Sequence, residues 1–136
     1  MELAEIVETF EFLDDWEDKY RFVIDLGKEL PELPAADRTD AALVRGCQSQ
    51  VWLHAELGSD GHLQLRMDSD AHIVRGLIAV VLAALDERPP AEVVDFDAED
   101  LFTRLDLLAH LSPTRGNGLR AMLARIKGTA EAYATT

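Results

Sequence analysis

Cysteine is almost absent from this sequence, because Cys47 is the one thiol among 136 residues. A single thiol excludes an internal disulfide, which agrees with a reducing compartment, and it excludes a zinc or iron–sulfur site built from this chain's thiolates alone. The amino-terminal residues also lack the basic segment and apolar run of a signal peptide. The longest apolar run, residues 77–85, is far shorter than the roughly 20 residues that span a bilayer. We therefore expect a cytoplasmic protein without membrane association.

Basic residues are scarce as well. Thirteen Lys and Arg stand against 26 Asp and Glu, for a net charge of −13. This balance argues against binding to nucleic-acid backbones or anionic lipids, which need clustered positive charge. The carboxyl-terminal segment departs from the trend and contains four bases: Arg115, Arg120, Arg125 and Lys127. Two interpretations stay open, namely solvated helix faces or a basic surface that steers an acidic partner.

Length and composition indicate one globular domain over residues 1–136. A chain of 15.1 kDa has the size of one compact domain, and a hydrophobic content of 48% is typical of a folded protein. The sequence has no internal repeat, no low-complexity tract and no linker-like change of composition.

Helical periodicity dominates both ends of the chain. Apolar spacing predicts a helix over residues 3–13 and a second one from Asp14 or Asp15 to just before Pro31, with residues 30–34 as an extended connector. Residues 71–86 are apolar nearly all round and predict a buried helix, capped by residues 68–70 and ended by Pro89 and Pro90. Further helices are predicted over three ranges: 91–96, 98–110 and 116–134.

The middle of the chain alternates with period two. Residues 51–57 and 63–67 predict the strands of a β-hairpin, since residues 58–61 have turn composition. Residues 42–45 predict a shorter additional strand. The expected fold class is α+β, with a small antiparallel β-sheet packed against several α-helices.

Cys47 lies immediately before this hairpin. A lone cysteine is commonly an inert, buried side chain. Gly46, however, permits a tight turn that presents the thiol, and Arg45 would lower its pKa if the guanidinium lay close. Three polar residues follow that could hydrogen-bond a thiolate or a sulfur adduct: Gln48, Ser49 and Gln50. Residue types alone leave the inert and the reactive interpretation open.

Residues 46–52, Gly-Cys-Gln-Ser-Gln-Val-Trp, resemble the active-site signature of the SufE family. This family comprises sulfur acceptors that work with cysteine desulfurases in iron–sulfur cluster assembly. Further segments resemble the family in the same order along the chain: residues 16–20, 26–31, 68–77 and 110–119. The likeness extends over about residues 10–130.

The resemblance implies that Cys47 accepts a sulfur atom from the persulfide of a SufS-like cysteine desulfurase, stimulates that enzyme and passes the sulfur to a cluster scaffold. The chain would be a sulfur carrier rather than a stand-alone enzyme. Pyridoxal phosphate would belong to the desulfurase, because this chain has no lysine in a recognisable cofactor context, and we expect neither cofactor nor metal here. The cluster scaffolds themselves are thought to share the fold, but one cysteine cannot hold a cluster.

Several other residues are candidates for the site. Arg115 either stabilises a persulfide anion or forms a salt bridge at a helix terminus, and His110 is expected to pack or cap rather than to transfer protons. Asp70 is expected to be a helix N-cap. Arg45, Arg115 and Arg120 are predicted to border the face that docks the desulfurase.

Two alternatives remain. The chain could activate a partner enzyme by binding alone, or it could be a cysteine hydrolase. A hydrolase needs a histidine within hydrogen-bond reach of Cys47, and the candidates are His54, His62, His72 and His110. For a sulfur carrier we expect Cys47 to rest partly sheltered, facing an apolar pocket near Val51 and Trp52, with Gly46 as the hinge of an outward swing.

Overall fold

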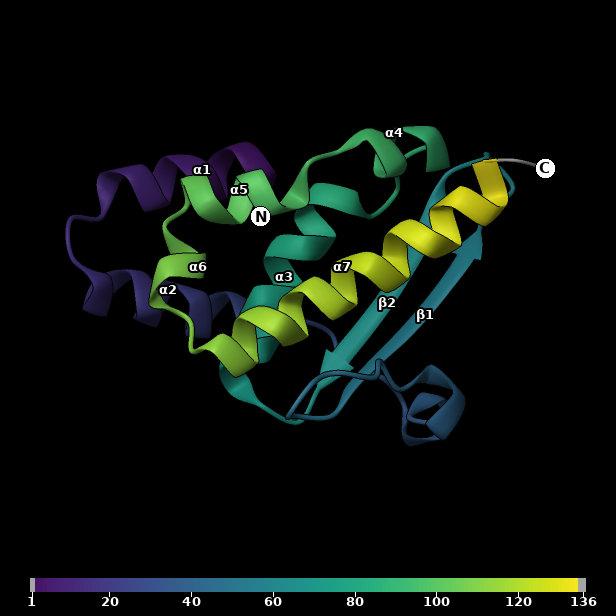
Figure 1. The fold of residues 1–136 in the computed structure, drawn as a ribbon, viewed down its shortest axis with the longest axis horizontal. Coiled ribbons are helices and arrows are strands. Elements are labelled where there is room, and N and C mark those ends of the chain that lie inside the picture. Colours follow the sequence, from purple (N-terminus) through teal and green to yellow (C-terminus); the bar gives the residue numbers. More distant parts are fainter. Residues whose placement is uncertain (1, 135–136) are drawn as a thin grey trace.

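A computed structural model describes residues 2–134 of the chain (Figure 1). Its helices and strands follow in this order: α1 (Leu3–Phe12), α2 (Trp16–Glu29), the 3₁₀ turns η1 (Ala35–Asp37) and η2 (Asp40–Ala42), β1 (Val51–Leu57), β2 (Leu63–Ser69), α3 (His72–Leu85), α4 (Pro90–Asp95), α5 (Ala98–Arg104), α6 (Leu107–His110) and α7 (Pro113–Ala134). The protein has the predicted α+β fold.

The buried helix α3 runs through the middle of the molecule, with α1 and α2 on one side and the hairpin on the other (Figure 1). Strands β1 and β2 pair antiparallel, from Val51 opposite Ser69 to Leu57 opposite Leu63. The core side of the hairpin is apolar and buried: Val51, Leu53, Leu63, Leu65 and Met67. The long helix α7 lies along the hairpin and α3, so it covers this core (Figure 1).

Helices α2 and α3 cross at backbone contact. A Cβ atom on Gly76 would lie 2.1 Å from the carbonyl oxygen of Val23, and one on Gly27 would lie 2.7 Å from the Gly76 nitrogen. Since no side chain fits at either position, the two glycines allow the backbones of α2 and α3 to approach closely.

Three of the predicted elements differ from those in the structure: one strand is absent, one helix is broken and one helix begins earlier. Residues 42–45 form no strand, because the Thr39 hydroxyl accepts a hydrogen bond from Ala42 N–H and caps η2, which leaves only a single bridge between Leu43 and Trp52. The helix predicted over 98–110 breaks at Asp106, whose φ is 61°. Helix α7 begins at Pro113 instead of residue 116, as suits a proline in the first turn.

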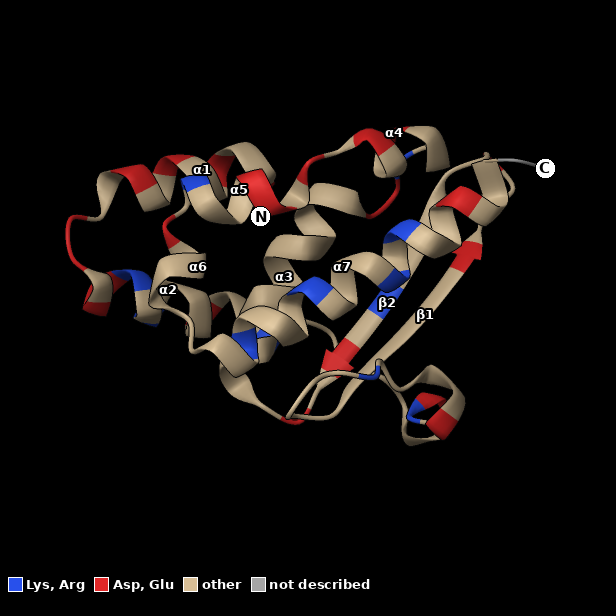
Figure 2. Ribbon diagram, in the orientation of Figure 1, with Lys and Arg blue, Asp and Glu red and all other residues tan. Residues whose placement is uncertain are grey.

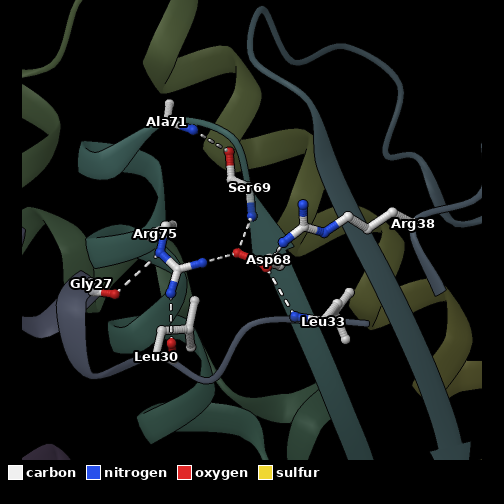
Figure 3. Close-up of polar contacts among 8 residues, drawn as sticks. All are labelled: Gly27, Leu30, Leu33, Arg38, Asp68, Ser69, Ala71 and Arg75. Carbon is white, nitrogen blue, oxygen red and sulfur yellow. Dashed lines mark hydrogen bonds and ion pairs between the residues drawn. The ribbon is translucent and has the colours of Figure 1, made fainter. Parts of the chain in front are cut away.

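The predicted cap at residues 68–70 is also wrong. Strand β2 continues through Asp68 and Ser69, and α3 begins after Ala71 without a side-chain cap. The carboxylate of Asp68 is fully buried. Its Oδ2 accepts hydrogen bonds from Leu33 N–H (3.0 Å) and the Arg38 guanidinium (3.1 Å), as Figure 3 shows.

The other oxygen of Asp68 connects the strand to the helices. Oδ1 accepts from Ser69 N–H (2.8 Å) and from the guanidinium of Arg75, a residue of α3. Arg75 also donates to two carbonyl oxygens at the end of α2, those of Gly27 (3.3 Å) and Leu30 (2.6 Å) (Figure 3). The buried charge therefore has a full set of partners, and it links β2, α3, α2 and the connector after α2.

Replacing Asp68 by Ala should lower the free energy of unfolding by about 3–5 kcal/mol, because the substitution leaves Arg75 largely buried and without its counter-ion. Urea unfolding followed by circular dichroism measures this loss. The control Glu131→Ala, at an exposed position of α7, should change the stability by less than about 0.5 kcal/mol. Equal effects of the two substitutions would contradict a central role for Asp68.

Candidate functional site

Residues 44–50 form a loop between η2 and β1, which we call the Cys47 loop. Gly46 has a φ of +93°, a left-handed conformation that favours glycine, and this confirms the predicted tight turn before the thiol. A Cβ atom on Gly46 would lie 3.3 Å from the Cβ of Ala121, so the turn rests against α7. At the start of the loop, Val44 N–H donates to the carbonyl of Val51 (2.8 Å).

The thiol of Cys47 is half-buried and lies against the backbone of α7. Its Sγ donates a hydrogen bond to the carbonyl oxygen of Gly118 (3.5 Å). A Cβ atom on Gly118 would lie 3.5 Å from Sγ, which is ordinary van der Waals contact, so the thiol packs directly against this position of the helix. Gly118 belongs to the segment that resembles the family, but the sequence assigned it no role in the site.

A small cavity of about 40 Å³ adjoins the thiol. Its apolar wall comes from β1, α3 and α7 and consists of Val51, Val74, Leu77, Leu119 and Met122. A cavity of roughly 10–15 Å³ already holds a water molecule, so there is room for one further sulfur atom next to Cys47. Cys47 thus rests in the sheltered, mostly apolar position expected of it, although Trp52 packs elsewhere, against Leu33 and Ala42.

Burial raises the pKa of the Cys47 thiol above its ordinary value. This direction is opposite to the one that a close guanidinium would cause, and Arg45 is exposed on the loop. The resting thiol is therefore protonated at neutral pH. Because the thiolate is the nucleophilic form, this position of the loop holds Cys47 in its less reactive form.

The cavity has a polar rim formed by Gln48, Ser49, Thr114 and Arg115. Arg115 is exposed in the first turn of α7, and among residues 2–134 its guanidinium forms no ion pair. The structure thus lacks the salt bridge that was the alternative interpretation of this residue. Arg120 behaves differently, because its Nε contacts Glu99 Oε1 at 3.0 Å, over another hollow of the surface.

Asp70 holds the far end of the Cys47 loop and does not cap α3. Its Oδ1 accepts a hydrogen bond from Gln50 N–H (3.0 Å), and its own N–H donates to the Gln50 carbonyl (3.3 Å). The N-cap prediction fails because β2 runs on to Ser69, which places Asp70 beside the loop.

The histidines of residues 2–134 have partners or surroundings other than the thiol in the hydrogen-bond pattern. His110 stacks on Trp16, with 4.1 Å between ring centroids, and its Nδ1 lies 2.9 Å from the Asp106 carbonyl, so the expected packing role is confirmed. His54 Nε2 contacts the Asp37 carbonyl. Within the described residues, no histidine is hydrogen-bonded to Cys47, so the Cys–His contact of a cysteine hydrolase is not formed in this structure.

Potential metal ligands meet at the opposite end of the hairpin. Asp60, His62 and Glu87 place their ligand atoms within 4.8 Å of one another near the β-turn. The two carboxylates are exposed, and the group is remote from the Cys47 loop because β1 separates them. It has no part in the site around the thiol.

Comparison with known proteins identifies the family. A family model described as "SufE: Fe-S metabolism associated domain" matches residues 4–130. The chain belongs to the SufE family. Membership associates it with Fe–S metabolism, in agreement with the resemblance seen in the sequence.

Relatives match the SufE chain over nearly its whole length. A protein of Rhizobium meliloti, named as an uncharacterized SufE-like protein, is 49% identical over 132 residues, or 95% of this chain and 94% of that protein. A similarly named protein of Rhizobium etli is 47% identical over 135 residues, or 97% and 91%. The solution structure of a hypothetical protein from Thermus thermophilus has a TM-score of 0.71 at 21% identity, covers 98% of this chain and 96% of that one, and supports the fold.

None of the helices between residues 2 and 134 combines the length and the apolar character needed to cross a membrane.

The alkylation of Cys47 by iodoacetamide should rise about tenfold per pH unit between about pH 7 and pH 8.5, because only the thiolate reacts and burial raises its pKa. The same chain unfolded in urea should react faster at neutral pH. Its rate should reach the plateau of full deprotonation at a lower pH than the rate of the native chain. Stopped-time alkylation read by mass spectrometry gives both profiles. If the rate of the native chain reached its plateau at a lower pH than the rate of the unfolded chain, the result would contradict a sheltered, protonated thiol.

Proposed function

We propose that this chain is a sulfur acceptor for iron–sulfur cluster assembly. Cys47 takes a sulfur atom from the persulfide of a pyridoxal-phosphate-dependent cysteine desulfurase of the SufS type, stimulates that enzyme, and delivers the sulfur to a cluster scaffold. The observation that carries this proposal is the sole thiol of a SufE-family chain, half-buried beside a cavity with room for one more sulfur atom.

The transfer is a thiol–persulfide exchange. The Cys47 thiolate attacks the outer sulfur of the donor's Cys–S–SH, an S–S bond to Cys47 forms, and the S–S bond of the donor breaks. The donor cysteine leaves as a thiolate, and the transferred sulfur keeps its proton. One S–S bond replaces another, so the step needs no external oxidant or reductant. A single cysteine suffices because the next acceptor contributes its own thiol.

The Cys47 thiol would be sheltered in one position of the loop and reactive in another. In the resting position the raised pKa keeps Cys47 protonated, which limits unwanted oxidation. Swinging outward about Gly46 would bring the thiol into water and into reach of the donor sulfur. In water the burial that raised its pKa is gone, so a larger fraction of the thiol is present as the reactive thiolate. After transfer, the persulfide would return to the cavity, where the unpaired Arg115 lies at the rim and favours an anion.

The main competing function is activation of the desulfurase by binding alone. Cys47→Ser decides between the two, because it preserves the size of the side chain. We expect the variant to lose the stimulation of alanine formation from cysteine, since it cannot accept sulfur. Alanine is measured in the presence of a catalytic amount of desulfurase and no reductant. A variant that stimulates as well as the wild type would establish the binding activator instead.

Docking should depend on the bases near the thiol. Figure 2 shows Lys and Arg along α7, whereas Asp and Glu predominate on α1 and at the start of α2. Arg115→Glu should lower the association rate with the desulfurase and flatten its dependence on salt, because exposed charges steer acidic partners over about one Debye length, ~8 Å at physiological salt.

Surface plasmon resonance at several salt concentrations measures the effect of Arg115→Glu. Arg104→Glu, the same change of charge on α5 at a position outside the cavity, is the control and should leave the rate nearly unchanged. If Arg115→Glu instead lowers only the melting temperature, the arginine has a structural role and the docking proposal fails.

A further inference from the structure

Arg125, in the middle of α7, binds the segment that leads into the Cys47 loop. Its Nη1 donates a hydrogen bond to the Leu43 carbonyl and its Nη2 donates to the Ala41 carbonyl (2.9 Å). Residues 41 and 43 immediately precede the loop, and 82 positions separate Leu43 from Arg125. The chemistry of the site described above makes no use of this side chain.

The same face of α7 carries the cavity and this contact. Gly118, which receives the Cys47 thiol, lies seven residues before Arg125, and Ala121, which faces Gly46, lies between them. Residues spaced by three, four and seven positions share one side of a helix. A rise of 1.5 Å per residue places Gly118 and Arg125 about 10 Å apart along α7. The helix therefore holds the thiol and the start of its loop at a fixed separation.

The contact divides a fixed part of the chain from a movable part. Ala42, between the two bound carbonyls, packs with Leu33 and Trp52 in a small buried cluster. Beyond Leu43, the loop is attached to its surroundings by few polar contacts: Val44 with Val51, Cys47 with Gly118, and Gln50 with Asp70. Val44 is also buried in the core, so an outward swing can begin after Val44 and end before Gln50.

We propose that Arg125 is a positioning residue of sulfur transfer. By binding both carbonyls it fixes the start of the Cys47 loop on α7, keeps the thiol beside Gly118, and confines the swing to residues 45–49. The role in sulfur transfer rests on the proposed function, whereas the effect of Arg125 on the position of the loop does not. The planar fork of arginine suits two acceptors at once, whereas the single ammonium group of lysine cannot reproduce this geometry.

The test compares Arg125→Lys and Arg125→Gln with the wild type in the full chain. Both variants should increase labelling of native Cys47 by a bulky maleimide about tenfold or more, because loss of charge-assisted hydrogen bonds raises the population of open loop. The pH profile of alkylation should also move to lower pH as the thiol loses burial. Lys127→Gln, an exposed change on the same helix, is the matched control and should label like the wild type.

Labelling is measured well below the melting temperature of each variant, so that global unfolding does not contribute. If either Arg125 variant folds and both its labelling rate and its pH profile match the wild type, the inference is overturned, whatever the melting temperature. The assay uses neither desulfurase nor sulfur. Failure of the proposed function would appear with Cys47→Ser, and would leave this result unchanged.

Discussion

The buried carboxylate of Asp68 is the interaction on which the rest of the architecture depends. It accepts hydrogen bonds from the connector after α2, from the strand itself and from two arginines, one of which also holds the end of α2. A buried charge is tolerated only when its partners are all in place, so the network favours one relative position of hairpin and helices. Asp70 follows Asp68 by two residues, directly after the end of β2, so the network also sets its position. Its side chain there accepts the hydrogen bond from Gln50 of the Cys47 loop.

Helix α7 is the second element that positions the Cys47 loop. It closes the core over α3 and the hairpin, and it presents to the Cys47 loop a surface made of glycine, alanine and an arginine fork. The resulting site is protective: burial raises the pKa of Cys47 and the cavity is small. The proposed sulfur carrier would need this property, because its cargo must survive between two partners, and delivery would require the loop to move.

The sequence predicted most of the helices, the hairpin and the turn at Gly46, because each depends on periodicity or on the conformational preference of residues close in the chain. It could not predict the burial of Asp68, since an acid just before an apolar helix is equally typical of an N-cap, and the deciding partner Leu33 lies 35 residues away. The acceptor of the thiol, Gly118, lies 71 residues from Cys47. Such contacts depend on how the helices pack, for which the local pattern carries no signal.

The central claim is that Cys47 itself carries the sulfur. Intact-protein mass spectrometry after incubation with a cysteine desulfurase and free cysteine tests it most directly. The account predicts that the chain gains one sulfur atom, that the added mass maps to the peptide containing Cys47, and that a thiol reductant removes it. An unmodified Cys47, while the desulfurase turns over in the same tube, would contradict the account.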